Sequence, residues 1–279
     1  MADWDPSLYL RYADARTRPA AELAAAIPLE RAARAVDLGC GPGNSTAVLA
    51  ARFPGAQVLG VDASPAMVER AVRGHPQLAF RVCDITAGLE ALGGGWDVVF
   101  SNACLQWVPG HRALVPALFA MLAPGGVLAV QVPMQSRQPV HGLLRQLAAG
   151  SRWRGSIARP RAFYLLEPEA YRRLLEGLTP EVHLWEAEFQ QTLDSHEALL
   201  DWYRATGLRP YLAQLAPGDI PAFEADVLEG IRRLYPLGAD GRVHFSMPRL
   251  FFTARRPGGG AHGPRQALQK EDEDENTGH

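Results

Sequence analysis

The stretch Val36-Asp37-Leu38-Gly39-Cys40-Gly41-Pro42-Gly43-Asn44-Ser45-Thr46 decides the fold. It passes from a short apolar run directly into a run with helical spacing, so it predicts a strand, a tight glycine turn and a helix. Glycine lets such a turn adopt positive φ and lets a ligand approach the backbone N–H groups. A dinucleotide fingerprint needs glycine at the sixth position from Gly39, where this chain has Asn44. The spacing therefore disfavours NAD.

The remainder of the first half repeats this alternation. Short apolar runs bounded by Gly, Pro, Asp or Asn predict strands at 34–38, 57–62, 78–83, 96–101 and 126–132. Helical patterns lie between them at 44–52, 65–74 and 111–122. Strands that alternate with helices of this length predict an α/β fold with a doubly wound, mostly parallel sheet.

The second half is richer in helices. We predict helices at 139–150, 168–178, 196–215 and 220–235, and two further strands at 182–192 and 243–254, which bring the sheet to seven strands. Helices inserted between late strands predict a cap over the sheet edge where open α/β sheets bind ligands. We divide the chain into an N-terminal lid segment at 1–28, a cofactor-binding core at 29–135, a helical cap with the last strands at 136–256, and a disordered acidic tail at 257–279.

Composition excludes several classes of function. The net charge is −2 and 47% of the residues are hydrophobic, enough to form a core without disulfides or a structural metal. Acids outnumber bases in the tail, so the rest of the chain is nearly neutral, which argues against a nucleic-acid partner. The sequence shows no signal peptide and no run of about 18 apolar residues, so we expect no membrane partner and a cytoplasmic location. The three cysteines lack zinc-site spacing, so we expect no metal. The oligomeric state stays open, with a monomer possible.

Polar side chains follow successive strands at the same sheet edge. Asp62 ends the second strand, where a carboxylate can accept both hydroxyls of a ribose. Asp84 follows the third strand, where an acceptor can hold an exocyclic adenine amine between the apolar walls of Ile85 and Met67. Asn102 follows the fourth strand. Each acid alone can equally be a turn or cap residue, but together with the glycine turn they predict one wall around a nucleoside.

This set of motifs resembles the Rossmann-like S-adenosylmethionine-dependent methyltransferases over about 29–132, including a Pro-Gly-Gly turn at 124–126. The resemblance implies S-adenosyl-L-methionine as cofactor, with the glycine turn at its methionine part and Asp62 at its ribose. The residues expected to bind the cofactor are Asp37, Gly39, Cys40, Gly41, Asn44, Asp62, Ala63, Met67, Asp84, Ile85 and Asn102.

A closer resemblance covers nearly all of 1–256. Among the stretches that carry it are Ser64-Pro65-Ala66-Met67, Leu105-Gln106-Trp107, Ala205-Thr206-Gly207-Leu208-Arg209-Pro210 and Pro248-Arg249-Leu250-Phe251, which resemble the trans-aconitate 2-methyltransferase family. The segment 135–160 departs from that family's pattern, and the tail extends beyond it. The resemblance implies that the acceptor is a carboxylate of a small unsaturated tricarboxylic acid and that the product is a monomethyl ester.

A carboxylate acceptor sets the chemistry that the site needs. It is ionised at pH 7, so it can attack a sulfonium methyl without a general base, and we expect no catalytic base. Forked arginines suit the carboxylates that do not react. The candidate substrate-binding residues are Arg209, Arg16, Arg249, Trp107 and Gln106, with Arg16 alternatively a partner of the cofactor's own carboxylate. A small-molecule methyltransferase with a different acceptor and a non-catalytic S-adenosylmethionine-binding protein remain as alternatives.

Overall fold

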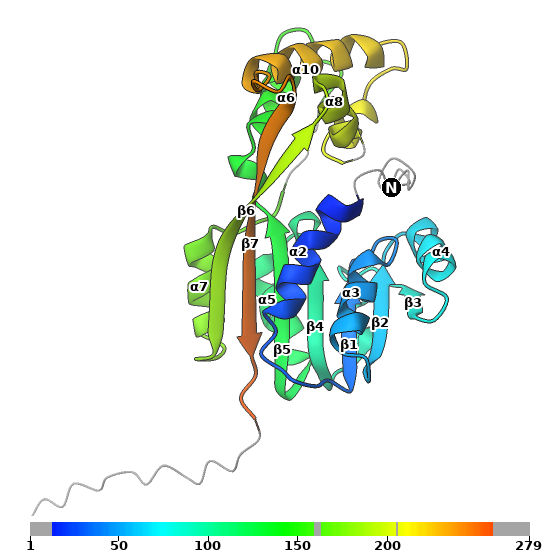
Figure 1. Cartoon of the computed structure of the whole chain (residues 1–279), viewed down its shortest axis with the longest axis vertical. Coiled ribbons are helices and arrows are strands. Elements are labelled where there is room, and N and C mark those ends of the chain that lie inside the picture. Colours follow the sequence, from blue (N-terminus) through cyan, green and yellow to red (C-terminus); the bar gives the residue numbers. More distant parts are fainter. Residues whose placement is uncertain (1–12, 159–162, 205, 259–279) are drawn as a thin grey trace, which may run out of the picture.

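A computed structural model of the chain describes residues 13–158, 163–204 and 206–258, with side chains from residue 17 onward. These residues form one seven-stranded sheet in the order β3-β2-β1-β4-β5-β7-β6 (Figure 1). The strands are β1 (Arg34–Leu38), β2 (Gln57–Asp62), β3 (Ala79–Val82), β4 (Trp96–Asn102), β5 (Leu122–Pro133), β6 (Val182–Leu193) and β7 (Val243–Arg255). Strands β1 to β5 run parallel, and β7 is antiparallel to both β5 and β6. The predicted α/β class and mostly parallel sheet are confirmed.

Helices cover both faces of this sheet. They are α2 (Ala13–Ala25), α3 (Asn44–Arg52), α4 (Pro65–Gly74), α5 (His111–Ala120) and α7 (Pro168–Glu176), with short 3₁₀ helices η1 (Leu89–Leu92), η2 (Leu105–Trp107) and η3 (Gln135–Arg137). In β4, Val98 and Phe100 join a hydrophobic cluster that contains α2 and α3, whereas Val99 joins the cluster of α5 and α7. Because side chains alternate along a strand, each face of the sheet packs on its own core.

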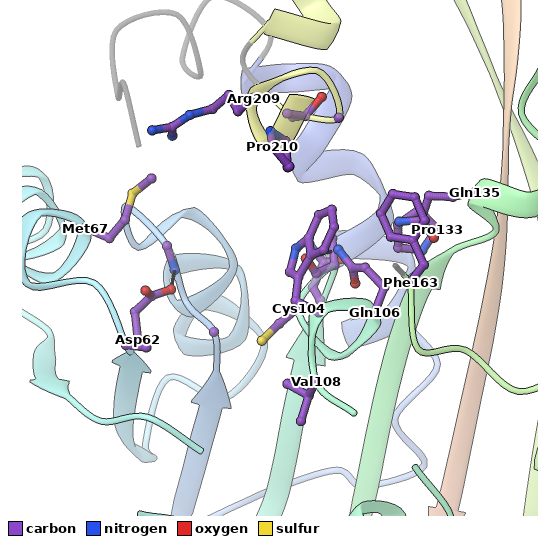
Figure 2. A pocket seen from close by; sticks show the side chains of 18 of the residues that line it. Asp62, Met67, Cys104, Gln106, Val108, Pro133, Gln135, Phe163, Arg209 and Pro210 are labelled. Carbon is purple, nitrogen blue, oxygen red and sulfur yellow. Dashed lines mark hydrogen bonds between the residues drawn. The ribbon is translucent and has the colours of Figure 1, made fainter. Parts of the chain in front are cut away.

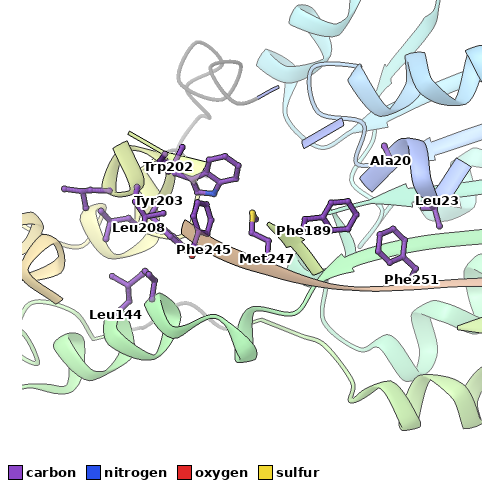
Figure 3. Close-up of a cluster of buried hydrophobic side chains, with 14 of the residues drawn as sticks. Ala20, Leu23, Leu144, Phe189, Trp202, Tyr203, Leu208, Phe245, Met247 and Phe251 are labelled. Atoms are coloured by element: carbon purple, nitrogen blue, oxygen red, sulfur yellow. The ribbon is translucent and has the colours of Figure 1, made fainter. Parts of the chain in front are cut away.

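A helical cap stands above one end of the sheet, where β6 and β7 extend beyond the parallel strands (Figure 1). It consists of α6 (Pro139–Ala149), α8 (His196–Arg204), α9 (Arg209–Leu212) and α10 (Ile220–Leu234). Phe189, Phe245 and Met247 on the two extended strands are buried in one cluster with Leu144 of α6 and Trp202 of α8 (Figure 3). This continuous apolar contact fixes the predicted cap over the carboxyl ends of the parallel strands.

Several boundaries differ from the sequence-based expectation. The segment 1–28 was expected to be a lid, but from residue 13 it contains α2, whose Leu23 and Ala24 are buried in the main core. Residues 1–12 lie outside the described residues. The single helix expected at 196–215 is divided into α8 and α9, and the expected turn at 124–126 lies inside β5, where Gly125 has a φ of +83°. The helix α2 is rich in alanine, which gave too little apolar contrast to reveal its buried side.

We predict that Leu23→Ala destabilises the whole α/β domain. Leu23 is fully buried, so its truncation leaves a cavity and costs about 2–5 kcal/mol in the free energy of unfolding. Urea unfolding measures this loss, and Ala21→Ser at an exposed position of the same helix is the matched control. Equal stability of the two variants would show that α2 is not part of the cooperative core.

Candidate active site

The turn between β1 and α3 packs against β2 and against the segment that follows β4. The backbone N–H groups of Gly39 and Cys40 donate to the Val61 carbonyl at 2.8 and 2.9 Å. Gly39 has a φ of +73°, and a Cβ there would lie 2.1 Å from the Cys104 Sγ. Only glycine therefore fits at this position, since any side chain would displace the segment that follows β4.

Asp62, at the end of β2, is held by the turn that it faces. Its Oδ2 accepts the Gly41 N–H at 2.9 Å, and its Oδ1 accepts the Ser64 N–H at 2.9 Å. Burial raises the pKa of this carboxyl, and the two backbone hydrogen bonds oppose that shift. The carboxylate is therefore fixed in orientation while it lines the pocket described next.

A cavity of about 700 Å³ lies at the carboxyl ends of the parallel strands, beneath the cap (Figure 2). Most of the sequence-predicted site residues come together here. Its lining includes Gly39, Gly41, Asp62, Ala63, Met67, Asp84, Ile85 and Asn102 from the loops that follow the parallel strands and from α4, Gln106 and Trp107 of η2, Arg209 of α9 and Arg249 of β7. Arg16 belongs to α2, but its side chain lies outside the described part of the chain.

Three expected cofactor residues, Asp37, Cys40 and Asn44, do not line the cavity. Asp37 is fully buried beneath the turn, where its Oδ2 accepts the hydroxyls of Ser45 at 2.6 Å and Thr46 at 2.7 Å. This carboxylate ties the start of α3 to β1, so its role is to shape the turn rather than to line the pocket. Sequence reasoning placed these residues correctly in the motif but could not tell which side chains face inward.

Charge is divided along the cavity. The acids in its lining are Asp62 and Asp84, which follow β2 and β3, whereas the arginines are Arg209 of α9 and Arg249 of β7. Figure 2 shows Arg209 on the cap side of the pocket, across from Asp62. Hydrogen bonds from Thr86 lower the pKa of Asp84, so this exposed acid is ionised at neutral pH. The lining that follows β2 and β3 suits hydrogen-bond donors or cations, and the lining from α9 and β7 suits anions.

The segment after β4 forms a strained turn in the middle of the cavity. Ala103 has a φ of +54°, which is uncommon for a residue with a side chain. Its N–H donates to the Gln131 carbonyl at 3.0 Å, and its carbonyl accepts from the Gln106 amide at 2.6 Å. Among the described residues, the buried oxygens Asn102 Oδ1 and Gln106 Oε1 have no hydrogen-bond partner. Such acceptors in a cavity are suited to donors on a ligand.

The cap side contains lining residues that are not among the candidates chosen from the sequence, although His141 is a possible base for a methyltransferase with a hydroxyl acceptor. The rings of Trp107 and His141 lie 5.0 and 4.9 Å from that of Phe163, centroid to centroid. Tyr203 donates its hydroxyl to Gln138 Oε1 at 3.2 Å, and both line the cavity. A signal was present: Gln135, Gln138 and His141 recur at three-residue spacing just before and within a helical pattern. The additional lining residues on this side are Gln135, Gln138, His141, Phe163, Trp202 and Tyr203.

Other features limit the chemistry that this site can perform. Burial raises the pKa of Cys104 to about 12, so this lining thiol stays protonated and is not a nucleophile. The described residues contain no cluster of three or more His, Cys, Asp or Glu side chains that could hold a metal ion. Within the same residues, no helix has the length and apolar character needed to cross a membrane.

Comparison with known proteins adds a family to this geometry. A methyltransferase-domain family matches residues 35–126. A trans-aconitate 2-methyltransferase of Methylobacterium radiotolerans is 46% identical over 260 residues, covering 92% of this chain and 99% of the relative. One from Escherichia coli is 42% identical over 258 residues, with the same coverage of both chains. The chain belongs to the trans-aconitate 2-methyltransferase family. It is therefore an S-adenosylmethionine-dependent methyltransferase, as the motifs around Gly39 and Asp62 predicted.

Solved structures support the fold at much lower sequence identity. The YcgJ protein from Bacillus subtilis has a TM-score of 0.57 at 13% identity, covering 87% of this chain and all of that one. A protein from Bacillus halodurans has a TM-score of 0.55 at 15% identity, covering 86% of this chain and 99% of that one. At these sequence identities the two structures show that this protein shares their fold, and they say nothing about its acceptor.

We predict that Asp37→Asn stabilises the protein most above pH 6. Burial raises the Asp37 pKa from 3.8 to about 6, against the Ser45 and Thr46 hydrogen bonds and with a smaller contribution from the Asp62 charge. A raised carboxyl pKa means that the folded state binds the proton more tightly than the unfolded chain does, so ionisation of Asp37 lowers the free energy of unfolding. This loss grows from pH 3.8 to about 6 and is then constant.

The advantage of the asparagine variant should therefore be small near pH 4 and reach about 2–3 kcal/mol at pH 7. Thermal unfolding of both proteins across this pH range measures it. A difference in Tm that does not change with pH would contradict a buried, ionisable Asp37.

Proposed function

We propose that this enzyme transfers the methyl group of S-adenosylmethionine to a carboxylate of trans-aconitate or a close polycarboxylate and forms the monomethyl ester. The observation that carries the proposal is the division of charge in the cavity lining, in which Asp62 and Asp84 follow the parallel strands β2 and β3 and the arginines Arg209 and Arg249 come from α9 and β7. A polyanionic acceptor requires a cationic end, and a nucleoside cofactor requires acceptors for its hydroxyl and amine groups. The names of the relatives support the same acceptor.

The lining residues around Asp62 and Asp84 fit the cofactor. Asp62 has free lone pairs on a fixed carboxylate for the ribose hydroxyls, and Asp84 is placed for the adenine amine beside Ile85 and Met67. The buried Asn102 Oδ1, which has no hydrogen-bond partner among the described residues, suits the α-ammonium of the methionine part. Gly39 and Gly41 let that part approach the backbone. S-adenosylmethionine supplies a methyl group bonded to a positively charged sulfur.

The two arginines of the lining, together with Gln106 and Trp107, bind and orient the acceptor. Arg209 and Arg249 pair with the carboxylates that do not react, while Gln106 and Trp107 position the third one. Its oxygen attacks the methyl carbon as the carbon–sulfur bond breaks, and no proton moves. Alignment of the reactants and exclusion of water by the cap can together supply on the order of 7–11 kcal/mol. In this proposal 29–135 binds the cofactor and contributes Gln106 and Trp107 to the acceptor site, whereas 136–256 contributes the two arginines.

A methyltransferase with a hydroxyl acceptor is the second candidate. It is favoured by His141, which lines the cavity within 5.6 Å of the Tyr203 ring, centroid to centroid, and can act as a general base. A carboxylate acceptor leaves this histidine without a proton to accept. The two candidates differ in their products, because an ester is cleaved by mild base and an ether is not.

We propose the cytoplasm as the place of reaction. All three cysteines, Cys40, Cys83 and Cys104, are free thiols, as is usual in a reducing compartment.

The test of the proposed function is transfer of labelled methyl from S-adenosylmethionine to trans-aconitate, cis-aconitate, citrate, isocitrate and simple dicarboxylates. We expect a methylated product from trans-aconitate whose label mild base releases as methanol. If the protein binds the cofactor but forms no base-labile product from this panel, the proposed carboxylate acceptor is wrong. A methylated product that is stable to base would support the hydroxyl candidate.

Substitutions of Asp62 and Arg209 should separate cofactor binding from acceptor binding. Asp62→Ala should weaken S-adenosylhomocysteine binding about 10–100-fold, and Arg209→Ala should raise the KM for the acid to a similar extent, because each removes a charged hydrogen bond. Calorimetry and initial rates measure these effects. Arg232→Ala is the control, since this exposed arginine pairs with Glu197 outside the cavity lining. If Arg209→Ala behaves like this control, the arginine does not bind the acceptor.

A further inference from the structure

Arg249 is held between two neighbouring strands deep in the cavity wall. The residue is 4% exposed, and it lines the cavity from β7. Toward β5, its Nη1 donates to Gln131 Oε1 at 3.1 Å. Toward β6, its guanidinium carbon lies 5.6 Å from the centroid of the Phe189 ring. An amide and an aromatic face therefore support the cation from both sides.

Strand register explains why this contact needs a long side chain at position 131. Gln131 lies opposite Phe251, and Arg249 lies opposite Pro133, so Gln131 and Arg249 are diagonal neighbours on one face of the sheet. Diagonal neighbours are about 7–8 Å apart at the backbone, a gap that only long side chains bridge. Gln131 is fully buried on the central part of the sheet, so its amide has one fixed environment.

The chemistry of the amide matters as much as its reach. Arg204 in the cap shows the opposite arrangement, since it donates to both oxygens of Glu224 and forms an ion pair with Asp201. Acids in that position neutralise the guanidinium charge. An amide fixes the orientation of a guanidinium and adds no negative charge of its own. Because Arg249 donates to Gln131 Oε1, the amide orientation is defined, and Nε2 is a buried donor with no hydrogen-bond partner among the described residues.

We propose that Gln131 is a positioning residue for the methyl-transfer reaction, which orients the Arg249 guanidinium toward the acceptor through a neutral amide that adds no negative charge beside it. This inference rests on the proposed function, in which Arg249 binds a carboxylate that does not react. Glutamine, rather than glutamate, at position 131 then tunes the site for acceptors of high negative charge.

The deciding experiment uses Gln131→Glu, which keeps the reach of the side chain and adds a negative charge beside Arg249. We expect the KM for the tricarboxylate to rise about 10–100-fold, the range of a charged hydrogen bond, and the KM for a dicarboxylate acceptor to rise much less. The affinity for S-adenosylhomocysteine should stay near that of the wild type. A folding defect cannot produce a change that depends on the charge of the acceptor.

Gln131→Met is the matched variant of similar length without charge. It should lower kcat several-fold, because the guanidinium loses its fixed orientation, and it should leave the ratio of tricarboxylate to dicarboxylate KM unchanged. If Gln131→Glu does not fold, Gln131→Met alone tests the proposal, and a wild-type kcat for Gln131→Met would overturn it.

Arg249→Met separates the binding role of Arg249 from the positioning role of Gln131. If it leaves the tricarboxylate KM unchanged, the proposed role of Arg249 fails. If it raises that KM while both Gln131 variants match the wild type, only the positioning role fails.

Discussion

The architecture of the site depends on how closely the turn after β1 approaches the segment after β4. A Cβ on Gly39 would lie 2.1 Å from Cys104 Sγ, and the same turn is bonded through its backbone to Val61 of β2. Three parallel strands thereby end at one point, with Asp62, Ala103 and the turn itself around a common space. Asp37 supports this arrangement from below by accepting hydroxyls of Ser45 and Thr46. Its burial carries a cost in stability, which is a common feature of residues that shape functional sites.

The cap completes the site by bringing the opposite charge. The extended parts of β6 and β7 bury Phe189, Phe245 and Met247 in one core with the cap helices, and this apolar packing helps to bring Arg209 and Arg249 into the lining of the cavity. A reaction between a cationic sulfonium and an ionised carboxylate needs little acid–base chemistry. What it needs is a dry space in which the two charges meet in line, and packing of this kind provides it.

The first half of the chain could be predicted well from sequence because its strands are short apolar runs and its site residues directly follow them, as Asp62, Asp84 and Asn102 do. The same logic could not separate Asp37, which faces the turn, from Gly39 and Gly41, which face the cavity, because the two sides of a turn differ only in three dimensions. Helix α2 was missed since its alanines hide its buried side. Gln138 and His141 lie at the start of α6 and Tyr203 lies in α8, so only tertiary structure brings the three together.

We infer that one cavity holds a nucleoside cofactor against Asp62 and Asp84 and a polycarboxylate against Arg209 and Arg249. A crystal structure of the protein with S-adenosylhomocysteine and trans-aconitate would show both molecules in place. We expect the ribose on Asp62, two carboxylates of the acid on Arg209 and Arg249, and the third carboxylate within about 3–3.5 Å of the space for the transferred methyl, the separation of reacting atoms before attack. Trans-aconitate bound away from both arginines, or with no carboxylate oxygen facing the sulfur, would contradict it.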